Sequence, residues 1–319
     1  YDIVSEFRSL FISENLAGNR DVLLYRHYDQ AVGITHCVAS YNNLSESVNF
    51  GPTANLIKSF ICNDGEVWQN SSVEGANNFE LANMIKTRDP RLEATFYDKP
   101  SPRNKGSFWY INKFLPRSVA KSVEAGNSPP EEFTSSKNIT DYPELRYAEV
   151  LLNWIEAKAE LATIGGETVT QDDIDKTINK LRNRPIAPEA VAMGVTKTAP
   201  LRLDAIPDDP VRDADVPALI WEIRRERRME FAFEHSRIAD LKRWQKLEYM
   251  DTDANWDILC GGWVNFPNEL KTELTAANAG KFSVADLTGK FTTYSGENKA
   301  NMKGFYRSSI TIGRQPFLN

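Results

Sequence analysis

Apolar residues recur every three or four positions from Tyr142 onward, which is the spacing of one face of an α-helix. A second apolar stripe that includes Trp154 runs beside this face, so polar residues such as Glu156 are confined to a narrow column. The pattern predicts a helix that is buried over more than half of its circumference. Gly165-Gly166 predicts its end, because glycine readily adopts the left-handed conformation that closes a helix.

A second helix is predicted from Thr170. Asp173 follows three residues later, and a Thr with an acidic residue at this distance is typical of a capped helix start. Ile174, Ile178 and Leu181 provide its apolar face, and the helix is expected to stop before Pro185. Two helices joined by a short glycine turn would form a helical hairpin.

A third helix is predicted beyond a proline-rich excursion. Residues 185–217 contain six prolines, which predicts a stretch without long helices. Asp215 is the candidate cap of the next helix and Pro217 lies in its first turn. The apolar spacing then continues without interruption, so a single helix to about Leu247 is expected.

The rest of the chain lacks a sustained period. Residues 1–140 mix short apolar runs with Gly, Asn and Pro, which predicts loops, short strands and small helices. Residues 251–319 are rich in Asn, Gly, Thr and aromatic residues and are predicted to be irregular. With the helical scaffold of residues 141–250, these parts are expected to form one mainly α-helical domain.

The composition narrows the class of protein. The 319 residues are 41% hydrophobic and 26% charged, and their formal net charge is −6. This composition is typical of a folded globular protein and excludes the basic footprint of a nucleic-acid-binding protein. No stretch approaches the roughly 18 to 20 uninterrupted apolar residues that cross a membrane.

Cofactor chemistry has little support in the sequence. Cys37, Cys62 and Cys260 are far apart, so they define neither a zinc site nor a disulfide framework. No nucleotide-binding or nucleophile motif is present. We therefore expect no cofactor or metal. A structural calcium ion at an acidic loop such as Asp208-Asp209 stays open, without support from the pattern.

Four glutamates are spaced by four residues in the third helix and therefore stack on one face; they are Glu222, Glu226, Glu230 and Glu234. In water each such like-charged pair would destabilise the helix by about 0.2–0.5 kcal/mol. Arg225 and Arg237 can relieve the two ends of the column, and Arg227 can reach Glu230. Glu226 has no cation within reach on its own helix, so we predict that it pairs with an arginine of another helix, Arg146 or Arg182.

Two carboxylates could instead be a catalytic pair, as in glycoside hydrolysis. Catalytic acids are usually brought together from different segments at the floor of a cleft, whereas this column shares its helix with arginines. The structural hypothesis is therefore favoured. It assigns to ion pairs the side chains of Arg146, Glu149, Glu226, Arg227, Glu230 and Glu234.

Three segments resemble the SusD/RagB-like family. Residues 141–157, DYPELRYAEVLLNWIEA, resemble the family's helix RYAEVLLNYAEA, and residues 223–244, IRRERRMEFAFEHSRIADLKRW, resemble ERRIELAFEGHRFWDLRRW. Residues 88–92, RDPRL, are similar to the family's DPRL segment, and Asn63-Asp64-Gly65 is similar to its DG turn. His235-Ser236 stands where the family often has Gly-His or Gly-Lys.

The resemblance implies a SusD-like fold with tetratricopeptide-type helix pairs, a large loop-rich region and a few short strands. It implies a non-catalytic lipoprotein outside the cell, on the outer membrane of Bacteroidetes, that binds oligosaccharides or polysaccharides for a SusC-like TonB-dependent transporter. Family members are commonly longer than this chain, so the N-terminal half with the lipidated cysteine is expected to be missing here. None of the three cysteines is expected to be the lipid anchor.

A glycan would be recognised by flat aromatic faces and a few polar groups. The resemblance directs attention to the region before the DG turn, which favours Tyr28 and Tyr41, with Arg26 and Asn42 as polar neighbours. Further loop candidates are Trp68, Trp109 and Trp263, whereas the helical Trp154, Trp221 and Trp244 are expected to be core residues.

A peptide-binding or protein-binding tetratricopeptide-like module of a related uptake complex is the alternative function.

Overall fold

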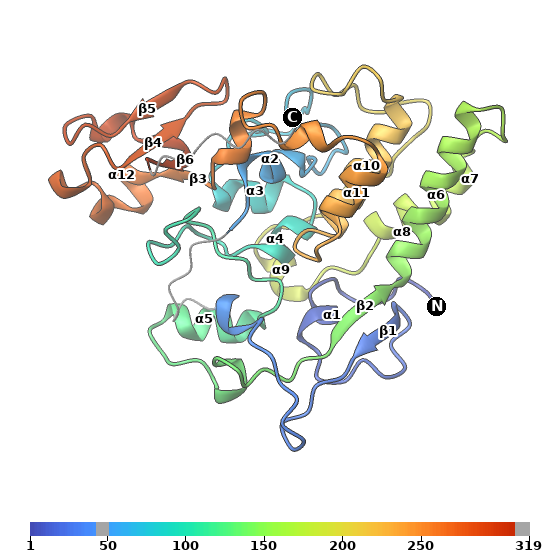
Figure 1. Ribbon diagram of the computed structural model, residues 1–319, viewed down its shortest axis with the longest axis horizontal. Coiled ribbons are helices and arrows are strands. Elements are labelled where there is room, and N and C mark those ends of the chain that lie inside the picture. Colours follow the sequence, from blue (N-terminus) through green and yellow to red (C-terminus); the bar gives the residue numbers. More distant parts are fainter. Residues whose placement is uncertain (43–50, 310–319) are drawn as a thin grey trace.

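The computed structural model describes residues 1–42 and 51–309, and within these ranges the fold is mainly α-helical with a few short strands (Figure 1). The α-helices are α1 (Ser9–Ile12), α2 (Ala54–Ser59), α3 (Leu81–Thr87), α4 (Arg91–Thr95), α5 (Arg117–Glu124), α6 (Tyr147–Thr163), α7 (Gln171–Lys176), α8 (Ile178–Arg182), α9 (Pro188–Ala192), α10 (Ala218–Glu230), α11 (Arg237–Arg243) and α12 (Phe266–Glu269). The strands are β1 (Val22–Arg26), β2 (Tyr142–Arg146), β3 (Trp263–Asn265), β4 (Phe282–Ala285), β5 (Phe291–Thr293) and β6 (Lys303–Ser308).

Helix α6 is the longest element, and it packs against α10, α7 and α8. Its inward residues Leu152 and Ile155 are fully buried together with Ile223 of α10. Glu156, predicted to be in the polar column, is also buried. Its carboxylate is satisfied there by hydrogen bonds from Arg243 at 2.6 Å and from Trp244 Nε1 at 2.5 Å. The apolar face was therefore predicted correctly, but the environment of Glu156 was not.

The predicted start of this helix at Tyr142 is wrong. Residues Tyr142–Arg146 form β2, which pairs antiparallel with β1, so that Tyr142 lies opposite Arg26 and Pro143 opposite Tyr25. Proline disfavours helical geometry in the residue before it, which is consistent with an extended Tyr142. The helical spacing of the apolar residues did not reveal the strand, because the pairing partner lies more than a hundred residues earlier in the chain.

The second predicted helix begins as expected. Thr170 accepts from the backbone N–H of Asp173, and Asp173 accepts in turn from the backbone N–H of Thr170 at 2.8 Å. Gly165 follows α6 with φ +96°, the left-handed conformation predicted for it. Thr177, with φ −121° and ψ −88°, divides the helix into α7 and α8.

The third predicted helix is interrupted after Glu230. Phe233 and His235 have φ values of +65° and +64°, so the chain turns before α11 starts. The Phe233 ring packs at 5.9 Å against Phe96, a contact from a distant segment that no helical periodicity could reveal. The N-cap of α10 is Pro217, and Asp215 does not cap the helix as predicted.

A four-stranded antiparallel sheet lies in the region predicted to be irregular, with strand order β3-β6-β4-β5. Val284 pairs with Tyr306, and both belong to a separate hydrophobic cluster of this lobe. Gly304 has φ +152°, and a Cβ atom there would lie 2.4 Å from the carbonyl oxygen of Ala285, so this close approach requires glycine. The strands are too short to show a clear alternation in the sequence.

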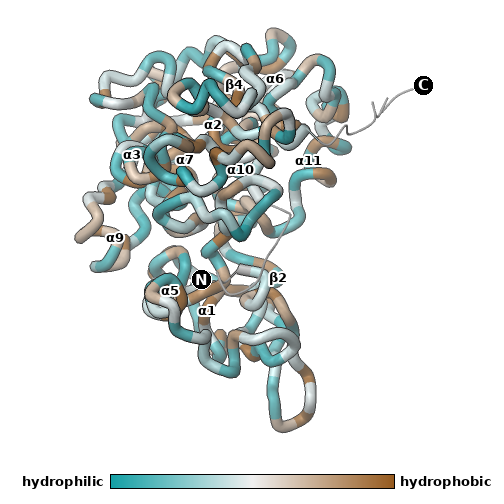
Figure 2. The backbone as a smooth tube through the Cα atoms, turned by 90° about the vertical axis from the view of Figure 1, so that its left-hand side faces the viewer, coloured by the Kyte–Doolittle hydropathy of each residue, from teal (hydrophilic) through white to brown (hydrophobic). Residues whose placement is uncertain are grey.

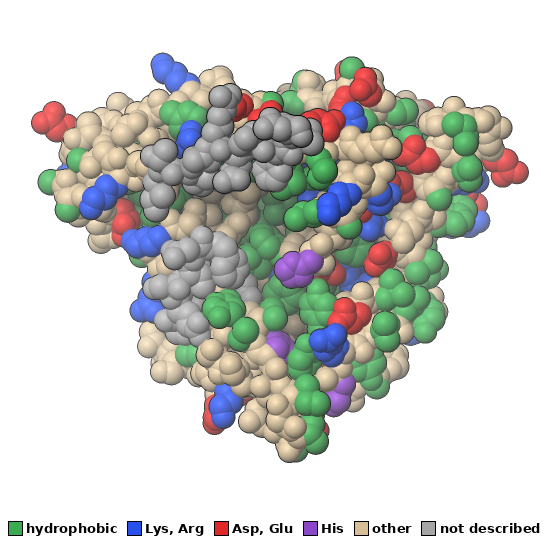
Figure 3. Space-filling view, in the orientation of Figure 1, with side chains coloured by type: hydrophobic (Ala, Val, Ile, Leu, Met, Phe, Trp, Pro, Cys, Tyr) green, Lys and Arg blue, Asp and Glu red, His purple; other side chains and the backbone are tan. Residues whose placement is uncertain are grey.

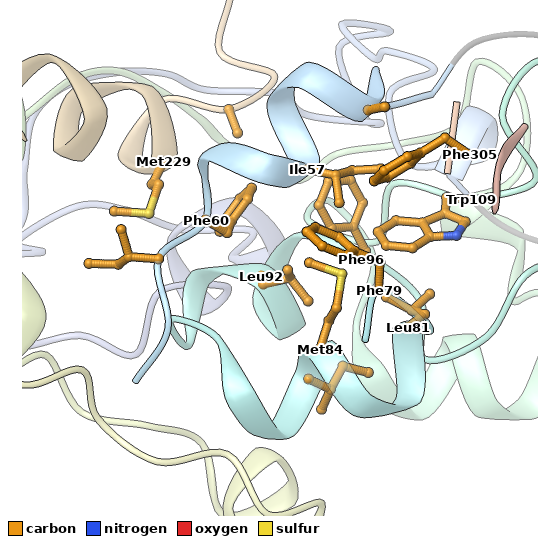
Figure 4. Close-up of a cluster of buried hydrophobic side chains, with 14 of the residues drawn as sticks. Ile57, Phe60, Phe79, Leu81, Met84, Leu92, Phe96, Trp109, Met229 and Phe305 are labelled. Atoms are coloured by element: carbon orange, nitrogen blue, oxygen red, sulfur yellow. The ribbon is translucent and has the colours of Figure 1, made fainter. Parts of the chain in front are cut away.

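The largest hydrophobic cluster joins α2, α3 and α4 to the C-terminal sheet. Phe60, Phe79, Phe96 and Trp109 meet at its centre, and Phe305 of β6 reaches it from the sheet (Figure 4). Seen from the side, α1, β2 and α5 lie in a lower part of the molecule, below α2, α3 and α10 (Figure 2). The expected mainly α-helical fold with a few short strands is thus confirmed for the described residues, whereas tetratricopeptide-type pairing stays a prediction.

Candidate functional site

Tyr28 lies at the start of a loop that leaves β1 and extends at the bottom of the molecule (Figure 1). Its ring is half-buried and packs edge-on against His36, with 4.4 Å between the ring centroids. His36 is held in turn, because its Nε2 lies 2.9 Å from the carbonyl oxygen of Thr140 and its backbone pairs with Asn138. The ring of Tyr28 is therefore held in one orientation at the surface.

A buried carboxylate organises the same loop. Asp141 is 1% exposed and accepts hydrogen bonds from the backbone N–H of Leu16 at 2.8 Å and of Tyr28 at 3.3 Å. The Nδ1 of His27 lies 2.8 Å from its Oδ1. Because a carboxylate only accepts, Nδ1 carries the proton, and in the neutral ring Nε2 is an acceptor. The His27 side chain is 59% exposed, so the buried carboxylate orients an imidazole toward solvent.

The other residues predicted from this region are more exposed. Arg26 is 65% exposed and forms an ion pair of 3.4 Å with Glu144. Tyr41 is 44% exposed and follows a backbone segment that Asn138 holds by accepting from Ala39 and Ser40. The side chain of Asn42 lies outside the described residues.

Arg26, His27, Tyr28, His36 and Tyr41 lie on one chain segment, and we call the surface that this segment exposes the loop 27–42 surface. Figure 3 shows histidine and charged side chains among hydrophobic ones over the part of the molecule where β1, β2 and this loop lie.

The predicted tryptophans form a separate group. Trp68 and Trp263 are half-buried, and both contact Phe79, at 5.3 Å and 6.1 Å between ring centroids. Trp109 is fully buried and donates from Nε1 to the carbonyl oxygen of Trp263 at 3.0 Å. Trp109 was therefore wrongly predicted as a ligand contact, because the close packing of the central cluster leaves its ring no exposed face.

The three helical tryptophans, all expected to be core residues, differ in how far they are buried. Trp154, predicted to be a core residue, is 47% exposed on α6. Trp244 is largely buried, as predicted. Trp221 is half-buried and donates from Nε1 to Asp209 at 2.8 Å, while Arg225 also contacts this carboxylate. The Asp209 carboxylate therefore has both an indole N–H and a guanidinium as partners.

Three of the four stacked glutamates of α10 and the following turn are bound by cations from other segments. Glu226 accepts from Arg91 at 2.6 Å and from Arg182 at 3.1 Å. Glu230 accepts at 2.6 Å from Arg146, at 3.0 Å from Arg184 and at 3.1 Å from Arg91. Glu226 and Glu230 are 0% exposed, so each charge depends on these partners.

Arg182, one of the two partners predicted for Glu226, is bonded to it. The other, Arg146, binds Glu230 and Glu234 instead. Arg91 was missed, although it lies in the Arg-Asp-Pro-Arg-Leu segment that carries part of the family resemblance. Sequence spacing could not show that this segment packs against α10.

The other predicted pairs of this helix are confirmed only in part. Arg225 reaches Glu222 at 2.9 Å, as predicted. Arg227 binds Asp240 at 2.8 Å and lies 3.8 Å from Glu149, and no pair with Glu230 is among the contacts that the structure describes. The guanidinium of Arg237 lies 5.5 Å from the ring centroid of Trp244.

Burial and charge oppose each other in this network. Burial alone would raise the pKa of Glu230, but the attraction of Arg184, Arg146 and Arg91 outweighs it and holds the pKa well below its ordinary value. Burial lowers the pKa of Lys113 to about 8, against the attraction of Glu234. None of the four stacked glutamate side chains is more than 7% exposed, so none faces a substrate cleft.

The two best-defined cavities among the described residues are small. One lies between Arg8, Tyr97 and Asn112, the other beside Arg91 and Arg184, and each has a volume of about 30 Å³. Drug-sized ligands occupy pockets of about 300–1,000 Å³. Neither cavity would hold a sugar ring.

Comparison with known proteins places the chain in a family. The model of the SusD family matches residues 28–306. The fold is similar to the crystal structure of a SusD-like carbohydrate-binding protein from Bacteroides fragilis, with a TM-score of 0.61 and 21% sequence identity. The match covers 92% of this chain and 52% of the neighbour, so the chain spans about half of the neighbour's length. No curated protein sequence matched. The chain belongs to the SusD family.

Proposed function

We propose that this protein binds glycans without catalysis on the loop 27–42 surface. Membership of the SusD family, over residues 28–306, carries the proposal. The structural neighbour, described as a carbohydrate-binding protein, supports it. The alternative enzymatic function has no support, because the stacked carboxylates are buried in ion pairs and do not face each other across a cleft.

The chemistry of the loop 27–42 surface suits a sugar. The rings of Tyr28 and Tyr41 offer apolar faces to the C–H surface of a pyranose. The imidazole of His27 and the guanidinium of Arg26 lie on the same chain segment and offer an acceptor and donors to hydroxyl groups. Asp141 holds His27 in place from below, which reduces the entropy lost when a ligand is bound.

A direct test uses affinity electrophoresis of the 319-residue chain through gels that contain starch, xylan, arabinan or laminarin. We expect at least one polysaccharide to retard the chain. The double substitution Tyr28→Ala and Tyr41→Ala should weaken retardation by about tenfold or more, because the loss of two aromatic contacts exceeds 1.4 kcal/mol.

Trp154→Ala is the matched control, because Trp154 is 47% exposed and Tyr41 is 44% exposed, on different elements. The control should leave retardation unchanged. Unchanged retardation in the double tyrosine variant would remove the loop 27–42 surface from the proposal. Retardation by no polysaccharide, with binding to a peptide digest measured by calorimetry, would favour the peptide-binding alternative.

The family also suggests a cellular location for the protein and a transporter that would receive its ligand. We propose that the protein acts at the outer face of the outer membrane and passes its ligand to a SusC-like TonB-dependent transporter. In the part of the chain that the structure describes, no helix is long and apolar enough to cross a membrane. A lipid anchor is the means of attachment that the family resemblance suggests, and we include it in the proposal. Co-purification of the protein with the transporter from detergent-solubilised outer membranes tests the partnership. If the protein is absent from the washed outer-membrane fraction, the proposed location is contradicted.

A further inference from the structure

Three arginines of α10 and α11 form a group that we call the arginine cluster: Arg224, Arg228 and Arg237. Arg224 and Arg228 are about one helical turn apart, so their side chains lie on the same face of α10. The guanidinium groups of Arg224 and Arg237 lie over the ring of Trp244, at 4.6 Å and 5.5 Å from its centroid. Figure 3 shows Lys and Arg side chains over the position that α11 has in Figure 1.

Two members of the arginine cluster lack a carboxylate partner in the part of the chain that the structure describes. Arg228 donates to Asn55 Oδ1 at 2.7 Å, but an amide oxygen carries no net charge. Arg237 has neither a hydrogen bond nor an ion pair with any residue in the ranges 1–42 and 51–309. By contrast, the arginines around the stacked glutamates each bind a carboxylate: Arg91, Arg146, Arg182 and Arg184.

The carboxylates whose charges act on these two arginines are bound to other cations. Asp257, which attracts Arg228, is 5% exposed and pairs with a lysine of α2. Asp240, which attracts Arg237, binds two other arginines, at 2.8 Å and 2.9 Å. Neither carboxylate is therefore free to neutralise the arginine cluster.

The positive charges of the arginine cluster repel one another. Burial and then the charge of Arg237 lower the pKa of Arg228 well below its ordinary value. Burial also lowers the pKa of Arg237 to about 10, and the charge of Arg224 adds to this effect. A bound anion would oppose both shifts, because an opposite charge favours the protonated guanidinium. Since the whole chain has a formal net charge of −6, the attraction for an anion is local to this cluster.

The charge and the donors of the arginine cluster indicate the class of anion. A guanidinium presents parallel N–H donors whose geometry matches the oxygens of an oxyanion. Arg228 and Arg237 together carry two uncompensated positive charges, which a doubly charged anion neutralises and a singly charged one does not. Their donors come from two separate helices, and a tetrahedral ion has enough oxygens to accept from both.

We propose that Arg228 and Arg237, with Arg224 beside them, form a binding site for a doubly charged tetrahedral oxyanion, either a free phosphate or sulfate ion or the phosphate group of a larger ligand. This assignment does not depend on the proposed glycan binding, because the arginine cluster and the loop 27–42 surface share no residue.

Calorimetric titration of the 319-residue chain tests the proposal, with phosphate, sulfate and acetate compared at constant ionic strength. We expect phosphate and sulfate to bind, and acetate to bind about tenfold more weakly or not at all. Glucose 6-phosphate distinguishes a phosphorylated ligand from a free ion, and binding of either supports the site. Equal affinity for acetate, or no binding of phosphate and sulfate, would overturn the proposal.

Substitutions locate the site. Arg228→Gln and Arg237→Gln should each weaken phosphate binding by about tenfold or more. Lys242→Gln is the matched control, because it removes one positive charge from an exposed position of α11. The control should leave the affinity nearly unchanged. Equal losses in all three variants would mean that only the overall charge matters, and the assignment to these arginines would be wrong.

Chemical protection of the unsubstituted chain gives a readout that does not require any variant to fold. Phenylglyoxal modifies accessible guanidinium groups, and mass spectrometry identifies each modified arginine. Phosphate should slow the modification of Arg237 by about tenfold and leave that of Arg202, which is 64% exposed, unchanged. Equal modification of Arg237 with and without phosphate would contradict the proposal.

Discussion

Arg91 donates to Glu226 at 2.6 Å, although the two residues are 135 positions apart. Both side chains are almost completely buried, at 4% and 0% exposure. The bond therefore ties the segment that resembles the family's DPRL motif to the segment that carries its most specific helix. Two motifs that are separate in the sequence form one buried ion network in the fold.

Removal of Arg91 should destabilise the protein strongly. Arg91→Ala leaves Asp89 without its arginine and removes one partner each from Glu226 and Glu230. Breaking a buried pair typically costs about 3–5 kcal/mol, because an uncompensated charge stays in the interior. Urea unfolding followed by circular dichroism measures the loss.

Arg202→Ala is the control for Arg91→Ala, since its ion pair with Asp204 joins side chains that are 64% and 67% exposed. The control should cost less than about 1 kcal/mol. Equal losses in the two variants would show that the buried network contributes no more than a surface pair.

His235→Gly should stabilise the protein. His235 is exposed and has φ +64°, a conformation that costs a residue with a Cβ roughly 1–2 kcal/mol but is open to glycine. We expect the free energy of unfolding to rise by about 1 kcal/mol. Ser236→Gly, at the N-cap of α11 with φ −77°, should lower it by only about a few tenths of a kcal/mol. Loss of stability in His235→Gly would mean that its side chain contributes more than the backbone conformation costs.

Glu269 should make stability depend on pH. Burial, assisted by the charge of Glu80 and opposed by a hydrogen bond from the backbone N–H of Asn265, raises the pKa of Glu269 to about 7 from its ordinary value of 4.5. The folded state then holds a proton that the unfolded state releases above pH 4.5, so this residue's contribution to stability falls as pH rises from 4.5 to about 7.

Glu269→Gln should abolish this dependence. The variant should equal the parent chain in stability near pH 4 and exceed it at pH 8, in thermal unfolding at both values. A stability difference of the same size at pH 4 and pH 8 would contradict a raised pKa. Asp286→Asn is a control in the opposite direction, because side-chain and backbone hydrogen bonds from Thr288 and Lys290 lower the pKa of Asp286.

Thr170 should contribute a measurable cap to α7. Thr170→Ala removes the side chain that accepts from the backbone N–H of Asp173, and such losses cost about 0.5–2 kcal/mol. Thr168→Ala, at an exposed position just before the cap, should cost little. Thermal unfolding compares the two. An equal effect would assign the loss to the loop rather than to the cap.

The sequence alone was sufficient for features that depend on neighbouring residues and for the family. The buried face of α6 follows from a spacing of three and four residues, and the cap at Thr170 from a residue three positions away. The motifs around residues 88–92, 141–157 and 223–244 identified the SusD/RagB-like family without any contact being known.

Tertiary structure decided the features that depend on distant segments. Tyr142–Arg146 is a strand because β1 pairs with it, and the chain turns after Glu230 where Phe233 packs against Phe96. The burial of Trp109 and the exposure of Trp154 were likewise reversed from expectation. The physical reason is the same in each case: periodicity and caps act over about four residues, whereas strand pairing, ion pairs and burial depend on contacts between segments whose meeting only the folded chain specifies.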